Sequence, residues 1–308
     1  MYTKKLKVLS LFDGIACCRQ ALERAGLTVA EYYASEINLR SIIITQHRYP
    51  DTIQVGDVRN LRGQDFLGVD LLSAGSPCQN FSMMGHKKGM ITTTNIIVDS
   101  LENYMQLKAE GFEFEGQSYL LWEFVRLVRE IRPKYFFLEN VKMDPKWMAI
   151  ITVALGVRPK HLNSSLVSGQ NRDRLYWTNI PLSHIDDLGV MIWDVIPEAT
   201  EAAGRRGRIL PGDDEYTPYL TLRKDGKSNC IVTSPYMTGR YFTKDGEYKM
   251  ITPEHAEALQ TIEIGYTDVP GVPKTSRYEV LGNAWTVDMI VKFFENLKTE
   301  RSLQGEIK

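Results

Sequence analysis

The chain has few cysteines and almost no net charge, and both shortages limit what it can be. Its four cysteines, Cys17, Cys18, Cys78 and Cys230, are too few and too scattered for a disulfide framework, and no pair has metal-ligand spacing with histidine. We therefore expect reduced thiols and no metal site. The 37 basic and 38 acidic residues give a net charge of −1, so any nucleic-acid partner must be held by a local basic face.

A long apolar run is also missing from the amino terminus. The first residues, up to Leu11, contain only a short apolar segment, too brief for a signal peptide and far short of a membrane span. A cytoplasmic location is the expectation. With 43% hydrophobic residues among 308, and no repeat or low-complexity tract, the composition predicts a compact globular protein of enzyme size.

Apolar strands alternate with helices along the first half of the chain. We predict helices at residues 17–25, 38–47 and 121–131, and strands at 6–12, 29–35, 53–55, 69–73 and 135–138. Alternation of this kind favours right-handed crossover units and a parallel sheet. The predicted fold class is therefore α/β, with a doubly wound and mostly parallel sheet.

A change of composition after Pro181 indicates a second unit. Glycine, proline and charge become more frequent there, and only short strand-like pieces appear, near residues 219–222 and 230–233. Helical signals return at Thr252, and a last amphipathic helix is predicted at 285–297. We expect a main domain made of residues 1–181 and 249–308, and a small irregular lobe made of residues 182–248. No element is predicted for residues 90–116, which lack sustained periodicity.

Two reactive side chains follow predicted neighbouring strands. Cys78, in Ser76-Pro77-Cys78-Gln79, comes shortly after one strand, and Glu139 directly follows another. The carboxyl ends of parallel strands meet at one edge of a sheet, where ligands bind. A lone cysteine is most often a small buried apolar residue. A thiol and an acid at this edge could nevertheless act together on a small planar substrate by covalent catalysis.

The first turn has the position of a nucleotide-binding loop without its usual sequence. Phe12-Asp13-Gly14 follows a strand and opens a helix, yet the three-glycine dinucleotide fingerprint and the phosphate loop are both absent. NAD and ATP are therefore disfavoured. A cofactor with adenosine but no phosphates needs one acid for the ribose hydroxyls and one for the adenine amino group. Glu36 and Asp57 stand at the ends of the second and third strands, although acids in such places often only cap helices.

Seven motifs, in this order, resemble those of the DNA (cytosine-5) methyltransferases. They run across nearly the whole chain: Leu11-Phe12-Asp13-Gly14, Ser35-Glu36, Gly56-Asp57-Val58, Gly75-Ser76-Pro77-Cys78-Gln79, Phe137-Leu138-Glu139-Asn140-Val141, Gln170-Asn171-Arg172-Asp173-Arg174 and Leu281-Gly282-Asn283. Residues 9–16 and Ala284-Trp285 look closest to the catalytic domain of the animal de novo methyltransferases. The resemblance implies a Rossmann-like class I methyltransferase that uses S-adenosylmethionine, releases S-adenosylhomocysteine and acts on double-stranded DNA.

The resemblance also implies roles for named residues. The thiolate of Cys78 adds to carbon 6 of cytosine, and Glu139, protonated near neutral pH, binds ring nitrogen 3 and the exocyclic amine. Arg174 contacts the carbonyl oxygen of the base, and Arg172 helps to hold the active-site loop or a nearby phosphate, the alternative for either arginine being an ordinary ion pair. The implied cofactor-binding residues are Phe12, Asp13, Gly14, Glu36, Ile37, Asp57, Val58, Asn283 and Trp285.

Carbon 6 is hidden in a duplex, so the cytosine must swing out of the base stack into the pocket. The lobe at 182–248 is where the resemblance puts target recognition, and the segment 81–89 is expected to close over the base. The predicted DNA-binding residues are Gln79, Ser82, Lys87, Lys88, Arg205, Arg208, Ser234 and Arg240. Residues 90–116 depart from the family pattern, as an insertion that could contact DNA or a partner.

Three other functions stay open. An RNA methyltransferase acting on tRNA would keep the pocket and change the lobe. A catalytically silent DNA-binding relative would have no chemical reason to keep Cys78 and Glu139, and an oxidoreductase is disfavoured by the missing glycines. A prokaryotic or phage origin is expected. The recognised DNA sequence, a cognate restriction endonuclease and a homo-oligomer are left open by the sequence.

Overall fold

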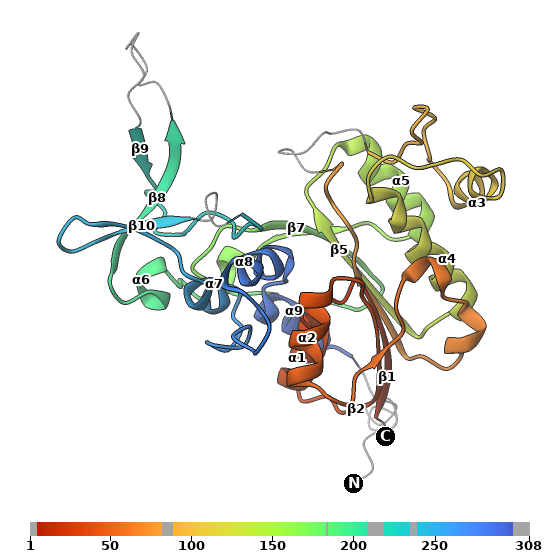
Figure 1. Cartoon of the computed structure of the whole chain (residues 1–308), viewed down its shortest axis with the longest axis horizontal. Coiled ribbons are helices and arrows are strands. Elements are labelled where there is room, and N and C mark those ends of the chain that lie inside the picture. The colour runs from red at the N-terminus through yellow and green to blue at the C-terminus, as the bar shows by residue number, and fades with distance from the viewer. Residues whose placement is uncertain (1–4, 82–88, 183, 208–218, 235–238, 298–308) are drawn as a thin grey trace.

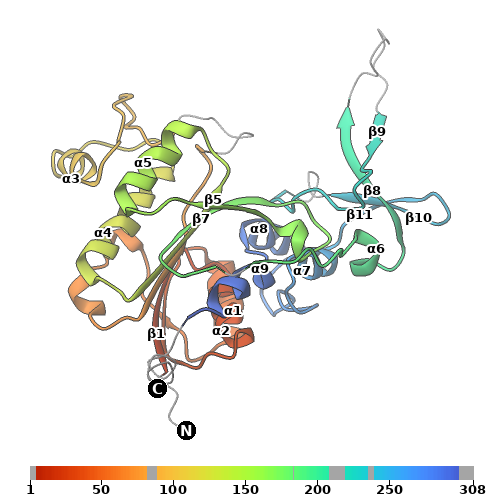
Figure 2. The same ribbon diagram turned by 180° about the vertical axis from the view of Figure 1, so that it is seen from behind.

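A seven-stranded sheet forms the centre of the molecule, which is a computed structural model that describes residues 5–81, 89–182, 184–207, 219–234 and 239–297 (Figures 1 and 2). The strands run in the order β3-β2-β1-β4-β5-β7-β6, and only β7 is antiparallel to its neighbours. The predicted doubly wound, mostly parallel sheet is therefore confirmed. The strand bounds are β1 Leu6–Leu11, β2 Val29–Ser35, β3 Ile53–Gln54, β4 Leu71–Gly75, β5 Tyr135–Val141, β6 Lys160–Asn163 and β7 Asp173–Thr178.

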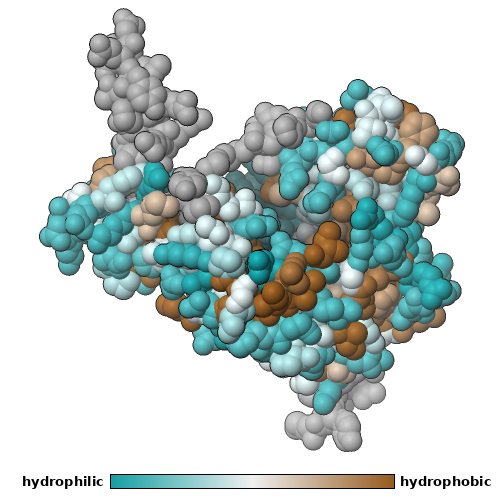
Figure 3. Space-filling model, viewed as in Figure 1, coloured by the Kyte–Doolittle hydropathy of each residue, from teal (hydrophilic) through white to brown (hydrophobic). Residues whose placement is uncertain are grey.

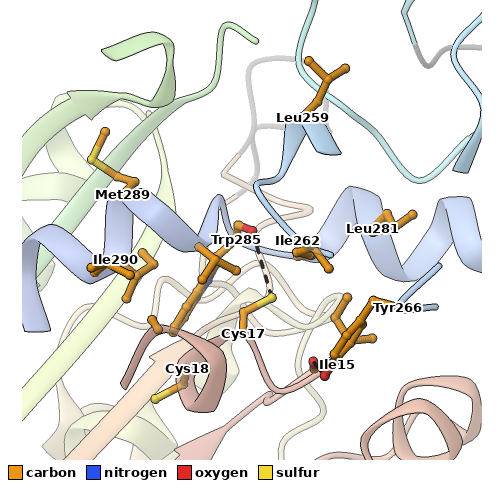
Figure 4. Close-up of a cluster of buried hydrophobic side chains, with 14 of the residues drawn as sticks. Ile15, Cys17, Cys18, Leu259, Ile262, Tyr266, Leu281, Trp285, Met289 and Ile290 are labelled. Carbon is orange, nitrogen blue, oxygen red and sulfur yellow. Dashed lines mark hydrogen bonds between the residues drawn. The ribbon is translucent and has the colours of Figure 1, made fainter. Parts of the chain in front are cut away.

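Helices cover both faces of this sheet (Figures 1 and 2). One layer contains α1 (Cys17–Arg24), α2 (Leu39–Arg48) and α9 (Val287–Phe294), and the other contains α3 (Leu101–Ala109), α4 (Leu121–Ile131) and α5 (Pro145–Leu155). Successive strand residues point to opposite faces. Val8 and Leu71 accordingly pack into the first layer's core, whereas Leu9 and Leu72 pack into the second. Figure 4 shows the first core, where Cys17 lies beside Trp285.

Local sequence sets where the elements after each strand begin. The Asn38 side chain caps α2 by accepting the Arg40 N–H at 2.9 Å, and Asp57 in the same way caps the short helix η1 (Val58–Asn60). Asp144 caps α5, which has Pro145 in its first turn. These caps lie at the carboxyl edge of the sheet, so the chain turns sharply there and leaves a cleft. The other short 3-10 helices are η2 Gly63–Phe66, η3 Ser118–Leu120 and η4 Ser164–Leu166.

Residues 90–116 are an ordered part of the second helical layer, although no element was predicted for them. They form α3, and Thr92 pairs with Phe114 in an antiparallel bridge. The carboxylate of Glu123 on α4, fully buried, holds α3 in place, because it accepts the Tyr104 hydroxyl and pairs with Lys108, both at 2.6 Å. The apolar face of α3 is short and the buried acid lies outside it, which explains why periodicity alone missed this helix.

A second, four-stranded antiparallel sheet stands to one side of the main sheet (Figures 1 and 2). Its order is β11-β10-β8-β9, and the predicted strand at 219–222 is present as β9. The predicted strand at 230–233 is wrong: these residues have no regular structure and instead receive hydrogen bonds from the main domain. The bounds here are α6 Ile192–Val195, β8 Ala199–Gly207, β9 Tyr219–Leu222, β10 Arg240–Thr243, β11 Tyr248–Met250, α7 Pro253–Leu259 and α8 Lys274–Asn283.

The surface of the described residues is mostly polar, with apolar side chains exposed near α1 and α2 on the face seen in Figure 3. Ile37 and Leu39, at the start of α2, are 63% and 62% exposed. Of the helices in the described ranges, none is long and apolar enough to cross a membrane.

Candidate active site

A cavity of about 750 Å³ lies at the carboxyl edge of the main sheet. Its wall is formed by segments that follow β1, β2, β3, β4 and β5, together with the start of β7 and the end of α8. All four predicted catalytic residues and all nine predicted cofactor-binding residues line it: Cys78, Glu139, Arg172 and Arg174 on one part of the wall, and Phe12, Asp13, Gly14, Glu36, Ile37, Asp57, Val58, Asn283 and Trp285 around the rest.

Cys78 lies three residues beyond the end of β4, in a turn fixed by its neighbours. The Asn140 amide donates to the Ser76 hydroxyl at 2.8 Å, and the Phe81 N–H donates to the Cys78 carbonyl at 2.9 Å. Burial raises the pKa of the Cys78 thiol, and the nearby Glu139 raises it further, while Arg174 and Arg172 oppose the shift. Without a bound substrate the thiol is therefore held mainly protonated at neutral pH.

Glu139 lies in the buried part of β5, directly opposite Gly75 in the register of β4. Its carboxylate is 8% exposed and is held from two sides. Arg174 on β7 pairs with Oε1, at 2.7 Å from Nε, and the Trp285 indole N–H donates to Oε2 at 3.1 Å. The acid has one arrangement in the cavity wall because both oxygens have a partner.

Arg172 lines the cavity and joins two other segments of backbone. It is 3% exposed, and its guanidinium donates to the carbonyl oxygens of Ile231 at 3.1 Å, Gly282 at 3.1 Å and Ala284 at 2.7 Å. It also lies 3.2 Å from the Cys230 sulfur. Arg172 therefore connects the segment between β9 and β10 to the end of α8, and its hydrogen-bonding capacity is largely used in doing so.

Three backbone N–H groups converge on Glu36 at the end of β2. Gly14 donates to Oε2 at 2.8 Å, while Ile37 and Asn38 donate to Oε1 at 2.7 and 2.8 Å. Gly14 has φ +60°, a conformation that glycine adopts at little cost. The first turn is thereby tied to the end of β2, which shapes the adjoining floor of the cavity.

Asp13 in the same turn is buried, and one of its oxygens lacks a partner. Oδ1 accepts the Tyr32 hydroxyl at 2.6 Å, but Oδ2 has no hydrogen-bond partner within the described ranges. Burial raises the pKa of Asp13 to about 7. An acid of this kind can gain or lose its proton near neutral pH, and a cation brought to its side of the cavity would favour the ionised form.

Asp57 is bound by its own neighbour, Arg59. It accepts the Arg59 N–H at 2.9 Å and pairs with the guanidinium, which lowers the pKa of Asp57. Gln117 and Tyr119, from the end of the inserted segment, also line the cavity, and sequence reasoning missed both. The sequence did contain one signal for them. Gly116-Gln117 comes shortly before the clearly amphipathic α4, and the start of a helix that leads into the next parallel strand lies near the carboxyl edge of the sheet.

The predicted DNA-binding residues are only partly located. Gln79 is exposed in the cavity wall, Ser234 is half-buried, and Arg240 on β10 donates to the Tyr248 hydroxyl at 2.9 Å. Arg205 lies on β8, a strand at this point described by its backbone alone. Ser82, Lys87, Lys88 and Arg208 lie outside the described residues, as does most of the segment 81–89.

Sequence comparison connects this site with known methyltransferases. Residues 6–143 match the family model described as C-5 cytosine-specific DNA methylase. The chain is 26% identical to the type II methyltransferase M.Bsp6I of Bacillus sp. strain RFL6, over 95% of this chain and 98% of that protein. It is 30% identical to the orphan methyltransferase M.SPRI of Bacillus phage SPR over 56% of this chain, a match that spans only 37% of the phage protein.

Solved structures have the same fold. A putative DNA modification methyltransferase encoded within an E. coli prophage has a TM-score of 0.63 and 17% identity, with 98% of this chain and 100% of that chain covered. Spodoptera frugiperda DNMT2 also has a TM-score of 0.63, with 16% identity and coverage of 95% and 99%. At these identities the likeness concerns the fold alone.

Proposed function

We propose that this chain, whose residues 6–143 match the C-5 cytosine-specific DNA methylase family model, transfers a methyl group from S-adenosylmethionine to carbon 5 of a flipped-out cytosine in double-stranded DNA. One observation carries the proposal. Cys78, Glu139 and Arg174 meet in the wall of a single cavity that is large enough for a nucleoside and a flipped base.

The chemistry of the cavity's other half suits S-adenosylmethionine. The unpartnered Oδ2 of Asp13 is an acceptor near which a cationic group is favoured, and this cofactor carries two positive charges. Glu36, with one acceptor position left, would hold the ribose hydroxyls, and Asp57 beside Val58 would face the adenine amino group. When bound, the cofactor supplies an electrophilic methyl group on its sulfonium.

Cys78 would be the nucleophile. Carbon 5 of cytosine is a poor nucleophile, so the thiolate first forms a bond to carbon 6 and makes carbon 5 electron-rich. The thiol is held protonated in the free protein, and Arg174 and Arg172 are the positive groups that favour its ionisation. After methylation, loss of the carbon-5 proton breaks the bond to Cys78 and restores the aromatic ring.

Glu139 and Arg174 would stabilise the negative charge that this addition puts on the ring. Glu139 gives a proton to nitrogen 3 and accepts the exocyclic amine, and takes the proton back when the thiolate leaves. Arg174, 2.7 Å from the acid, is placed to donate to the carbonyl oxygen of the same base. Arg172 would act at a distance, by fixing the backbone behind both groups.

The second sheet would hold the opened DNA. Arg240 projects from β10 beside Tyr248, with the guanidinium carbon 5.1 Å from the ring centroid. If Arg240→Ala weakens binding equally for all sequences, the residue contacts phosphate, and a loss confined to one sequence would assign it to base readout. DNA affinity should fall steeply with salt if several phosphates are contacted.

A methyl-transfer assay tests the proposal. Labelled S-adenosylmethionine is offered with duplex DNA, single-stranded DNA and tRNA, and Cys78→Ser is run beside the wild type. We expect transfer to duplex DNA and none by the variant, and we expect 5-fluorocytosine DNA to trap a covalent adduct at Cys78. Transfer to tRNA alone would reject DNA as the substrate, and transfer to nothing would favour a silent DNA-binding relative.

The names of the relatives differ on whether an endonuclease accompanies such a protein. M.SPRI is named an orphan methyltransferase and M.Bsp6I a type II methyltransferase. We propose the type II arrangement, in the cytoplasm of a prokaryote, because M.Bsp6I aligns over nearly its whole length. A neighbouring endonuclease whose cleavage is blocked by this chain's methylation would support it.

A further inference from the structure

Trp285 lines the cavity, and contacts on several sides hold its backbone and its ring in position. Its backbone carbonyl accepts the Cys17 thiol, 4.0 Å away, as Figure 4 shows, and its ring packs edge-on against Phe137 with centroids 5.5 Å apart. Gly75 at the end of β4 leaves the room, because a Cβ there would lie 2.8 Å from the indole nitrogen. The indole is 8% exposed in total.

This seat directs the indole N–H at Glu139. The N–H is 3.1 Å from Oε2, and the two residues are 146 positions apart in the chain. An indole can only donate, so the bond forms with an oxygen that does not carry a proton. Arg174, also a donor only, occupies Oε1. In the free protein both oxygens of the acid thus face donors, whereas the proposed reaction needs the acid to give a proton to the base.

We propose that Trp285 is a positioning residue for Glu139: its N–H fixes the carboxylate against the end of β4 and sets how readily that carboxylate takes up the proton delivered to cytosine. This role rests on the proposed function and adds to the cofactor contact predicted for Trp285 from the sequence. The other titratable or charged groups around Glu139 are Cys78 after β4, Arg174 and Tyr176 on β7, and Arg172 at its start.

The test separates proton uptake from the thiol chemistry. In a Cys78→Ser background, binding of duplex DNA is measured against pH, with a duplex that lacks the target base as reference. The difference reports how the base is held, and it requires a proton shared between Glu139 and nitrogen 3. Trp285→Phe replaces the indole with a smaller aromatic ring and removes the N–H that favours the ionised acid. We expect the loss of base binding at high pH to move upward by about one pH unit, since a hydrogen bond to a charged group is worth about tenfold in an equilibrium constant.

Two further variants make the result specific. Gly75→Ala keeps Trp285 in the sequence, but its added Cβ displaces the indole from Glu139. It should therefore move the pH profile of base binding in the same direction as Trp285→Phe. The double variant of the two substitutions should add little more. Trp177→Phe is the matched control. Trp177 is buried in the other core and donates to the Thr152 hydroxyl at 3.1 Å, so the same chemical loss there should leave the profile unchanged.

Each result has one reading. A Trp285→Phe profile that coincides with that of the parent, with single-turnover methylation intact in the Cys78-containing protein, overturns the role, even if cofactor affinity falls. A shift seen equally in Trp177→Phe also overturns it, as a general effect of a loosened core. If the Cys78-containing protein methylates no cytosine in DNA, the proposed function itself has failed, and this role fails with it.

Discussion

Arg172 and Arg174 are two positions apart, and the structure predicts that replacing them has opposite consequences. Arg172→Met keeps the apolar stem but removes the arginine donor from the carbonyl groups of Ile231, Gly282 and Ala284, of which Ala284 still accepts the Gln260 amide at 3.1 Å. Each unsatisfied buried carbonyl costs about 1–3 kcal/mol. Because the carbonyl groups of Ile231 and Gly282 lose this donor while Ala284 keeps another, we expect a combined loss of about 4 kcal/mol of unfolding free energy.

Arg174→Met removes a partner of Glu139 and little else. Glu139 keeps the Trp285 N–H and borders the cavity, where water can reach it, so the loss should be about 1–2 kcal/mol, below the cost of breaking a fully buried pair. Its effect on methyl transfer should be large, about 100- to 1,000-fold, as for the loss of one group that stabilises charge in a transition state.

Urea unfolding and single-turnover methylation of duplex DNA, measured on both variants, check the contrast. Arg172→Met should unfold at a much lower urea concentration while its folded fraction at low temperature retains methylation activity. Arg174→Met should unfold near the wild-type midpoint and be almost inactive. Wild-type stability for Arg172→Met together with a complete loss of activity would refute the reasoning, and would return Arg172 to a direct role at the substrate.

Two other substitutions test buried acids. Burial raises the pKa of Asp13 to about 7, so the contribution of Asp13 to stability is full below about pH 4 and is lost as the pH rises through 7. The side chain of Asp13→Asn cannot titrate. The unfolding free energy of this variant should therefore decline less than that of the wild type between pH 4 and 8. Parallel curves would contradict this. Glu123→Gln should lower the unfolding free energy, measured with urea, by about 3 kcal/mol, because it breaks the buried contacts with Lys108 and Arg126. Glu102→Gln, in an exposed pair, should cost below about 0.5 kcal/mol. Equal losses in the two variants would count against the buried network.

What the sequence could predict was carried by short segments. Strands such as β1 and β5 are apolar on both faces because helices cover both, so their position followed from composition alone. Cys78 and Glu139 could be brought together because one follows β4 by three residues and the other lies near the carboxyl end of β5, and parallel strands end at one edge of the sheet. The register that places Gly75 opposite Glu139 was not predicted.

What the sequence could not predict depends on contacts between distant segments. Nothing near Trp285 indicates that its N–H reaches Glu139, and nothing near Arg172 indicates that its partners lie between β9 and β10 and at the end of α8. The strand β6 is short, polar and at the edge of the sheet, so it carries no apolar signal. The residues at 230–233 are apolar because Ile231 is buried, which is not evidence for a strand.

For the acids at the strand ends, capping is compatible with the ligand binding that we propose. A carboxylate offers about four acceptor positions, and the N–H groups of Gly14, Ile37 and Asn38 take three at Glu36, which leaves one for a hydroxyl of a ligand. The three N–H groups also draw the first turn against the end of β2, which makes the cleft that such a ligand would need. Asp57 differs, because Arg59 contacts both of its oxygens, so an adenine amino group there would compete with a cation already in place. For the proposed cofactor, the ribose end of the cavity would therefore be preformed, and the adenine end would have to rearrange around Arg59 before Asp57 could bind it.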